Sequence, residues 1–372
     1  MSSGWKDCQV GDVITLQRGF DIVKKQLQPG IYDVIFSSGI GGTHNDFKVK
    51  APGVVIGRKG TLGTVFFTKK DFWPTDTTLW VKDFHGNDEK FAYYFLQTMH
   101  LEQLDCGAAN PTLNRNHIHT LPVRYPPLPI QRKIAAILSG YDRLIENNTR
   151  RIEILEEMAR SLYREWFVKF RFPGHEQVQM VDSELGLIPE GWEVGRLDDA
   201  LILQRGFDLP TQQRKGGNIP IYASTGVTGT HNEAKVKAPG VVTGRSGSLG
   251  TVIYIDEDFW PLNTTLWVKE FRRVTPLYAF YLLSDLKLEQ YNSGAAVPTL
   301  NRNDIHGRPV VIPPQQILEQ LNLFVEPLLV LKKNLLKRSD NLRQTRDLLL
   351  PRLISGEIDV ENLDINTEEI AA

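Results

Sequence analysis

The chain has 372 residues, of which 41% are apolar and 23% are charged, and its formal net charge is −1 at pH 7. This length and composition predict two packed globular domains, and no apolar run is long enough to predict a membrane span. Cys8 and Cys106 form no pattern typical of a metal site or a disulfide framework. With the lack of a secretion signal, they favour a cytoplasmic location.

The first predicted domain covers residues 1–129 and is rich in β-strands. Short alternating runs such as "GVVIGRKGTLGTVFF" and "TTLWVKDF" are joined by glycine turns, which is typical of strands and hairpins. One helix is expected within it, over residues 89–104, where the aromatic and leucine spacing fits a buried face.

A long helix is predicted over residues 130–170, because this stretch contains almost no helix-breaking residue until its end. Its apolar residues recur in alternating steps of three and four, which is the seam of a coiled coil. The seam residues are Ile134, Leu138, Tyr141, Ile145, Asn148, Ile152, Leu155, Ala159, Leu162 and Trp166. A polar linker follows over residues 171–190.

The second half is expected to repeat this order. A β-rich domain covers residues 191–314, and a second long helix covers residues 315–356. The seam of that helix is looser and runs through Leu321, Val325, Leu328, Lys332, Leu335, Ser339, Leu342, Arg346, Leu349 and Leu353. Residues 357–372 form an acidic tail with six acidic residues and no Lys or Arg.

The tail changes what the net charge implies. It contributes −6 to a total of −1, which leaves +5 for residues 1–356. This mild excess permits DNA binding but does not require it, since the basic residues would have to cluster on one surface.

The two halves are copies of one design. The segment "KVKAPGVV" at residues 48–55 returns unchanged at residues 235–242, and a constant shift of 187 aligns almost the whole chain. The same shift superimposes "LQRGFD" on "LQRGFD" and "GAANPTLNRN" on "GAAVPTLNRN". The repeated units are domain-sized, which argues against a solenoid of short repeats.

The long helices are expected to pack against each other, because neither apolar seam is stable in water alone. If they pack antiparallel, the two β-rich domains are related by a pseudo-twofold axis. Direct repeats in the sequence would then be inverted repeats in space, which is the symmetry of a DNA target with two inverted half-sites.

These features resemble one family. The resemblance lies in the ends of the two β-rich halves, "PPLPIQRKI" and "PPQQILEQL", in the linker "SELGLIPEGW", in the helix "LEEMARSLYREWFVKF" and in the closing segment "LRQTRDLLLPRLISGEIDV". In these segments the chain resembles specificity subunits of type I restriction-modification systems. The resemblance implies an α+β fold with two target recognition domains separated by two antiparallel coiled-coil helices. It also implies double-stranded DNA, two modification (methyltransferase) subunits and restriction (translocase and nuclease) subunits as partners.

The resemblance further implies that the chain is a non-catalytic subunit without a cofactor. In agreement, the sequence has no phosphate-binding GxxxxGK[ST] loop, no paired-cysteine metal spacing and no GxSxG nucleophile turn.

Candidate DNA-binding residues occur in matched pairs. The glycine turns "GRKGTLG" and "GRSGSLG" each present an arginine suited to guanine or to a phosphate, although the glycines alone suffice to make a hairpin. The matched histidines are either DNA contacts or structural residues, and the matched lysines are either phosphate contacts or a solvated strand edge. The candidates are Arg18, His44, Lys48, Lys50, Arg58, Lys59, Thr61, Arg205, His231, Lys235, Lys237, Arg245, Ser246 and Ser248.

Differences between the half-sites should be read where the copies diverge. The largest divergence lies between residues 22–42 and residues 209–229. Because most other segments match, the two half-sites are expected to share bases.

The first long helix offers a candidate surface for partner subunits. Its candidates are the charged residues Arg151, Glu157 and Arg160, which also suit a solvated face, and the large aromatics Trp166 and Phe167. The aromatics fit either a contact with a modification subunit or the junction with the second domain.

Three alternatives remain open from the sequence: a catalytic site without a recognisable motif, a specificity module of another restriction-modification class, and a coiled-coil scaffold that binds DNA without sequence preference.

Overall fold

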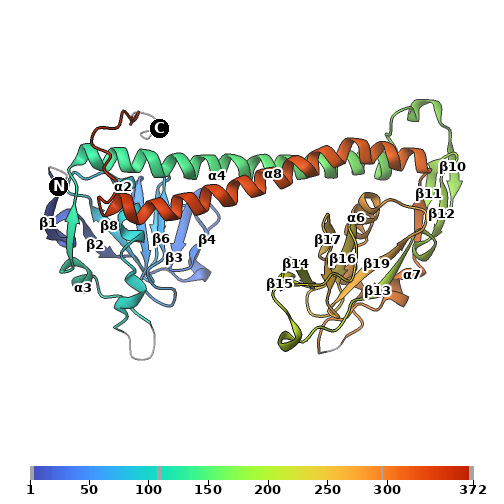
Figure 1. The fold of residues 1–372 in the computed structure, drawn as a ribbon, viewed down its shortest axis with the longest axis horizontal. Coiled ribbons are helices and arrows are strands. Elements are labelled where there is room, and N and C mark those ends of the chain that lie inside the picture. Colours follow the sequence, from blue (N-terminus) through green and yellow to red (C-terminus); the bar gives the residue numbers. More distant parts are fainter. Residues whose placement is uncertain (1–3, 107–110, 295, 368–372) are drawn as a thin grey trace. The chain divides into compact units, whose positions relative to one another are not determined.

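Two units of similar design make up the computed structural model, which describes residues 4–106, 111–294 and 296–367 (Figure 1). Unit 1 comprises Met1–Arg150 and Leu335–Ala372, and unit 2 comprises Arg151–Asn334. The two long helices, α4 (Leu128–Tyr163) and α8 (Gln315–Ile354), are each divided between the units. Both helices were expected from the sequence. None of the described helices is long and apolar enough to cross a membrane.

Unit 1 contains three sheets, with strand orders β2-β8-β5-β6, β4-β3-β7 and β1-β9. All pairs are antiparallel except β3 with β7. The strands are β1 (Lys6–Gln9), β2 (Thr15–Arg18), β3 (Tyr32–Phe36), β4 (Gly39–His44), β5 (Gly53–Gly57), β6 (Val65–Thr68), β7 (Phe72–Pro74), β8 (Thr78–Asp83) and β9 (Pro122–Tyr125).

Unit 2 repeats these sheets in the same order, as β13-β19-β16-β17, β15-β14-β18 and β12-β20. Its strands are β12 (Glu193–Arg196), β13 (Leu201–Arg205), β14 (Ile219–Ala223), β15 (Gly226–His231), β16 (Gly240–Gly244), β17 (Val252–Ile255), β18 (Trp260–Pro261), β19 (Thr265–Phe271) and β20 (Pro309–Ile312). The segment predicted as a linker contains a further hairpin of β10 (Met180–Ser183) and β11 (Gly186–Pro189), and its Phe172 and Ile188 are buried.

Short helices complete each unit at equivalent positions. In unit 1 they are α1 (Val10–Val13), α2 (Glu89–Gln97) and α3 (Arg115–His119), and in unit 2 they are α5 (Leu197–Ala200), α6 (Pro276–Asp285) and α7 (Arg302–His306). Asp88 caps α2 by accepting from the amide of Phe91, and Thr275 caps α6 by accepting from Tyr278. Both capped helices pack on the four-stranded sheet of their own unit.

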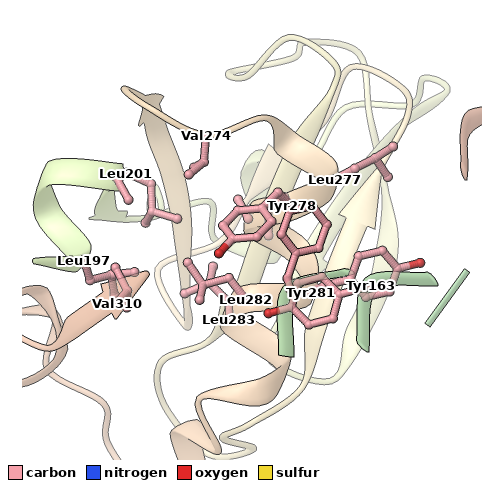
Figure 2. Packing of buried hydrophobic residues seen from close by; sticks show 14 of the residues in the cluster. Tyr163, Leu197, Leu201, Val274, Leu277, Tyr278, Tyr281, Leu282, Leu283 and Val310 are labelled. Atoms are coloured by element: carbon pink, nitrogen blue, oxygen red, sulfur yellow. The ribbon is translucent and has the colours of Figure 1, made fainter. Parts of the chain in front are cut away.

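The apolar core of each unit lies between its four-stranded sheet, its capped helix and its segments of α4 and α8. In unit 2, Tyr163 near the end of α4 stacks on Tyr281 of α6, with ring centroids 5.1 Å apart (Figure 2). A π-helical turn over Arg164–Val168 then ends the helix.

The predicted seam is confirmed. Each long helix was given ten seam residues, and none of them is exposed. The polar seam residues Asn148 and Ser339 are almost fully buried. Within unit 2, Glu156 pairs with Lys332 and Trp166 contacts Phe324, so the facing segments of the helices run antiparallel. Within unit 1, Asp142 pairs with Arg346.

Candidate nucleic-acid interface

Three turns meet at one end of the four-stranded sheet in unit 1. The turn after β5 begins at Arg58, whose amide donates to the carbonyl of Thr77, 2.9 Å away, in the turn between β7 and β8. The amide of Ser37, in the turn between β3 and β4, donates to the side-chain Oγ1 of the same Thr77 at 3.2 Å. Arg58 and its neighbours are therefore held on a framework of backbone hydrogen bonds.

Glycine is required where the first of these turns begins. A Cβ on Gly57 would lie 2.2 Å from the carbonyl oxygen of Thr61, and one on Gly244 would lie 1.8 Å from that of Ser248. These distances are too short for any side chain. The structural interpretation of the two glycines therefore holds, and the same close turn presents the arginine that follows each one.

Two arginines converge on one residue in unit 1. Arg18 Nη2 lies 2.6 Å from Asp21 Oδ1 and 3.5 Å from Asp76 Oδ2. Arg58 Nη1 donates to the backbone carbonyl of Asp76 at 3.3 Å. We call Arg18, Asp21, Arg58 and Asp76 the unit 1 arginine cluster.

The unit 2 arginine cluster has the same plan and consists of Arg205, Asp208, Arg245 and Asn263. Arg205 Nη2 lies 3.2 Å from Asp208 Oδ1, and Arg245 Nη1 donates to the carbonyl of Asn263 at 3.2 Å. The side-chain amide of Asn263 donates to Asp208. Both clusters are accessible, since the side chains of Arg18 and Arg205 are 45% and 51% exposed.

A groove of about 730 Å³ begins at the unit 1 cluster and extends along β2 towards α3. Besides Arg18 and Asp21, its polar lining includes Lys82, Arg115 and Asn116, all of them exposed. Lys82 and Asn116 were missed as DNA-binding candidates, whereas the sequence left Arg115 open between a DNA contact and a structural hydrogen bond. The shift of 187 carries a signal for them, because the equivalent residues Lys269, Arg302 and Asn303 are identical in type.

His119 forms the inner wall of this groove and has a structural role. Its Nε2 accepts a hydrogen bond from the amide of Leu16 at 2.9 Å, and His306 Nε2 accepts from Leu203 at 3.1 Å. Burial, assisted by the charge of Arg115, lowers the pKa of His119. The neutral ring therefore anchors α3 to β2.

For His44 and His231 the structure favours the structural alternative over a DNA contact. They are 9% and 4% exposed, and each ring packs edge-on against a tryptophan, Trp73 or Trp260. The Nδ1 atoms accept hydrogen bonds from the amides of Gln28 and Lys215. The Nδ1 atom of each ring is thus occupied within the fold.

Lys48 and Lys235 lie beside these tryptophans, at the end of the β3–β4 and β14–β15 hairpins away from the hairpin turns. Each ammonium sits over a ring, 4.5 Å from the centroid of Trp73 and 4.8 Å from that of Trp260. Lys237 pairs with Asp258 at 2.6 Å, and Lys50 is exposed. These four lysines therefore belong to a different part of each unit from the arginine clusters.

The other turn residues expected to contact DNA lie next to the arginines. Lys59, Thr61 and Ser248 are exposed, and Ser246 is half-buried. Lys59 and Ser246 form matching single bridges to Thr112 and Thr299.

The helix residues divide into exposed and buried sets. Arg151, Glu157 and Arg160 are exposed on α4. Trp166 and Phe167 are each only 6% exposed, and they pack in the core of unit 2. These two aromatics therefore lie at the junction with the second domain, which leaves them no surface for a partner subunit.

The described residues contain no group of three or more His, Cys, Asp or Glu side chains placed to hold a metal ion.

Comparison with known proteins decides the family. A family model described as "Type I restriction modification DNA specificity domain" matches residues 2–157 and again residues 189–337. The chain belongs to this family. It carries two specificity domains in tandem, and it is a DNA specificity subunit of the type I restriction-modification class.

Named relatives agree with this assignment, and a solved structure has the same fold. The MjaIX specificity subunit of Methanocaldococcus jannaschii is 29% identical over 306 residues, which is 75% of this chain and 71% of that protein. The MjaVIII specificity subunit of the same organism is 26% identical over 217 residues, 54% of this chain and half of that protein. The S subunit from M. genitalium has the same fold, with a TM-score of 0.65, 20% identity and coverage of 94% and 96% of the two chains.

Proposed function

We propose that each unit reads one half of a bipartite double-stranded DNA target through its arginine cluster. The observation that carries this proposal is the repetition of the cluster. An exposed arginine at the end of a strand and a half-buried arginine in a turn occur together at equivalent positions in both units. In both units the two guanidinium groups are at least partly exposed to solvent, so their remaining N–H groups can reach a DNA base or a phosphate.

The chemistry of the clusters suits a base edge flanked by phosphates. A guanidinium group donates two parallel hydrogen bonds, which match O6 and N7 of guanine in the major groove. Lys82 and Arg115 of the groove supply point charges that suit phosphates. The clusters would then specify bases, while the groove would hold the backbone.

The two half-sites are proposed to be related and inverted, and to differ where the units differ. The turn of the divergent hairpin β3–β4 lies against the cluster, since Ser37 donates to Thr77 next to Asp76. In unit 2, Ser224 donates to Thr264 at 3.3 Å in the same way. The divergent segments 22–42 and 209–229 are thus placed to contact bases beside those read by the arginines.

The chain is proposed to do no chemistry itself and to act with two modification subunits and with restriction subunits. On α4, the exposed charges Arg151, Glu157 and Arg160 alternate with two exposed apolar side chains, Ile154 and Met158. A second apolar surface lies on α8, where a shallow groove of about 490 Å³ is lined largely by Leu323, Pro327, Val330 and Leu331. Exposed apolar side chains gathered in this way are typical of a protein interface.

Binding-site selection with the full chain, co-expressed with a modification subunit, tests the proposal. The expected result is a bipartite site with related, inverted halves. Replacing Arg18 and Arg58 with alanine should remove selection of one half, and replacing Arg205 and Arg245 should remove selection of the other. Binding that depends on salt but selects no sequence would favour the scaffold alternative, and turnover by the isolated chain would favour the enzyme alternative.

A further inference from the structure

The two arginine clusters differ at one central position. Three of their four members are identical in type, namely Arg18 and Arg205, Asp21 and Asp208, and Arg58 and Arg245. The fourth is Asp76 in unit 1 and Asn263 in unit 2. This position lies outside the divergent segments that the sequence singled out, because its flanking residues are nearly the same in both copies.

The backbone at this position is the same in both units, so the difference is confined to the side chain. The carbonyls of Asp76 and Asn263 accept from the equivalent arginines at 3.3 and 3.2 Å. The next residue in each turn, Thr77 or Thr264, accepts two amides of the arginine turn through its carbonyl. Both side chains are partly exposed beside an accessible arginine.

The side chains differ in the hydrogen bonds that they can make. The Asp76 carboxylate only accepts, and within the cluster it lies 3.5 Å from the Arg18 guanidinium. Asn263 both donates and accepts, and one of its N–H groups is directed to Asp208. Within the part of the chain that the structure describes, its side-chain carbonyl oxygen and its second N–H group have no partner, so both are available to a base.

These patterns match different base pairs. A carboxylate accepts from the N4 amino group of cytosine, and a neighbouring guanidinium donates to O6 and N7 of the guanine paired with it. A side-chain amide forms two hydrogen bonds with N6 and N7 of adenine. The guanidinium flanking Asp76 therefore completes a pattern for a C·G pair, whereas Asn263 fits adenine.

We propose that residue 76 and its counterpart 263 distinguish the two half-sites, with Asp76 selecting cytosine and Asn263 selecting adenine at equivalent positions of the target. This inference rests on the proposed function of the clusters. The local net charge does not decide between the bases. Unit 1 has the acidic Asp76 and the basic Lys59 where unit 2 has the neutral Asn263 and Ser246, so the sum of the charges is the same in both units. The discrimination lies in donor and acceptor geometry.

The experiment exchanges the two side chains in the full chain, assayed by binding-site selection in the presence of the modification subunit. Asp76→Asn should change the preference from cytosine to adenine at one position of one half-site, on the order of tenfold, and leave the other half unchanged. Asn263→Asp should make the reciprocal change in the other half. Asp182→Asn, an exposed change of the same charge on the β10–β11 hairpin, serves as the control and should change neither half.

Several results would overturn the inference. If both exchange variants select the wild-type sequence, residue 76 does not read a base, although the proposed function stands. The same conclusion follows if either variant only weakens binding uniformly or alters both halves together. If the wild-type complex selects no sequence at all, the proposed function fails and this inference fails with it. Thermal unfolding of each variant identifies a folding defect, and the reciprocal variant in the other unit then decides the question.

Discussion

The guanidinium Nη1 of Arg346 lies 2.6 Å from Oδ1 of Asp142, and the hydroxyl of Tyr94 donates to the other oxygen of the same carboxylate. This group joins α4, α8 and α2 within unit 1. Burial and the hydrogen bond to Asp142 raise the pKa of Tyr94 far above its usual range, so the tyrosine remains a donor. The equivalent residues in unit 2 are Leu329, Ala159 and Tyr281, and all three contribute to an apolar core. The two copies thus join their three equivalent helices by different chemistry.

Replacing Arg346 with leucine should loosen unit 1, because the half-buried Asp142 carboxylate loses its cation. We expect a loss of about 1–3 kcal/mol in local stability. Hydrogen exchange should accelerate in residues 128–150 and remain unchanged in residues 151–163. Arg338→Leu, an exposed change on the same helix, is the control. The double variant Asp142→Leu/Arg346→Ala, which copies unit 2, should lose less than the sum of its single changes. Strictly additive losses would show that the pair is not coupled.

Two glycine substitutions should have opposite effects on stability. Gly57→Ala places a Cβ 2.2 Å from a carbonyl oxygen and should displace the turn that holds Arg58. We expect it to lower the midpoint of thermal unfolding and to abolish selection of one half-site. A Gly57→Ala protein with wild-type unfolding and selection would disprove the required close approach.

Gly140→Ala adds a methyl group inside α4, where no atom outside the backbone of the helix lies within 4 Å, and it should stabilise the helix by about 1 kcal/mol.

Much of the fold was predictable because the sequence contains two copies of the same domain and helix. The shift of 187 located the equivalent elements, and the alternating steps of three and four predicted seam residues that are all at least half-buried in both helices. The structure of the linker was less visible, since its hairpin depends on long-range burial of Phe172 and Ile188. The charged and polar composition of this segment alone predicts a loop.

The candidate site was only partly predictable, because a matched residue can be conserved between copies for packing or for binding. His44 and Arg58 were equally well matched, yet the histidine is buried against Trp73 while the arginine remains partly exposed at a turn. Lys82 and Arg115 are far apart in the sequence, and only the fold brings them to one groove. The importance of Asp76 emerges from two hydrogen-bonding arginines that no local pattern indicates.

Acid should destabilise both units through the half-buried histidines of α3 and α7. Burial is the main cause that lowers the pKa values of His119 and His306, whereas an unfolded histidine has a pKa of about 6.5. Below that pH the unfolded chain binds more protons than the folded chain, so stability falls as the pH falls. The variant His119→Gln/His306→Gln should therefore lose less thermal stability between about pH 7 and pH 5 than the wild type does. Asn116→Gln, an exposed change on α3 that alters no titratable group, should retain the wild-type pH dependence. Identical profiles for the double variant and the wild type would contradict this assignment.

Lys82 should contribute to DNA affinity without contributing to sequence selection. It is exposed in the groove beside Arg18 and Arg115, and an ammonium group on a flexible chain suits a phosphate better than a base edge. Lys82→Ala should weaken binding to all sequences by a similar factor and reduce the salt dependence of binding by about one released ion. Lys337→Ala, an exposed change on α8, should leave affinity and salt dependence unchanged. Titrations of the selected site and of a scrambled site at several salt concentrations would measure both effects. A change in the selected bases in Lys82→Ala would instead place this lysine among the residues that read the sequence.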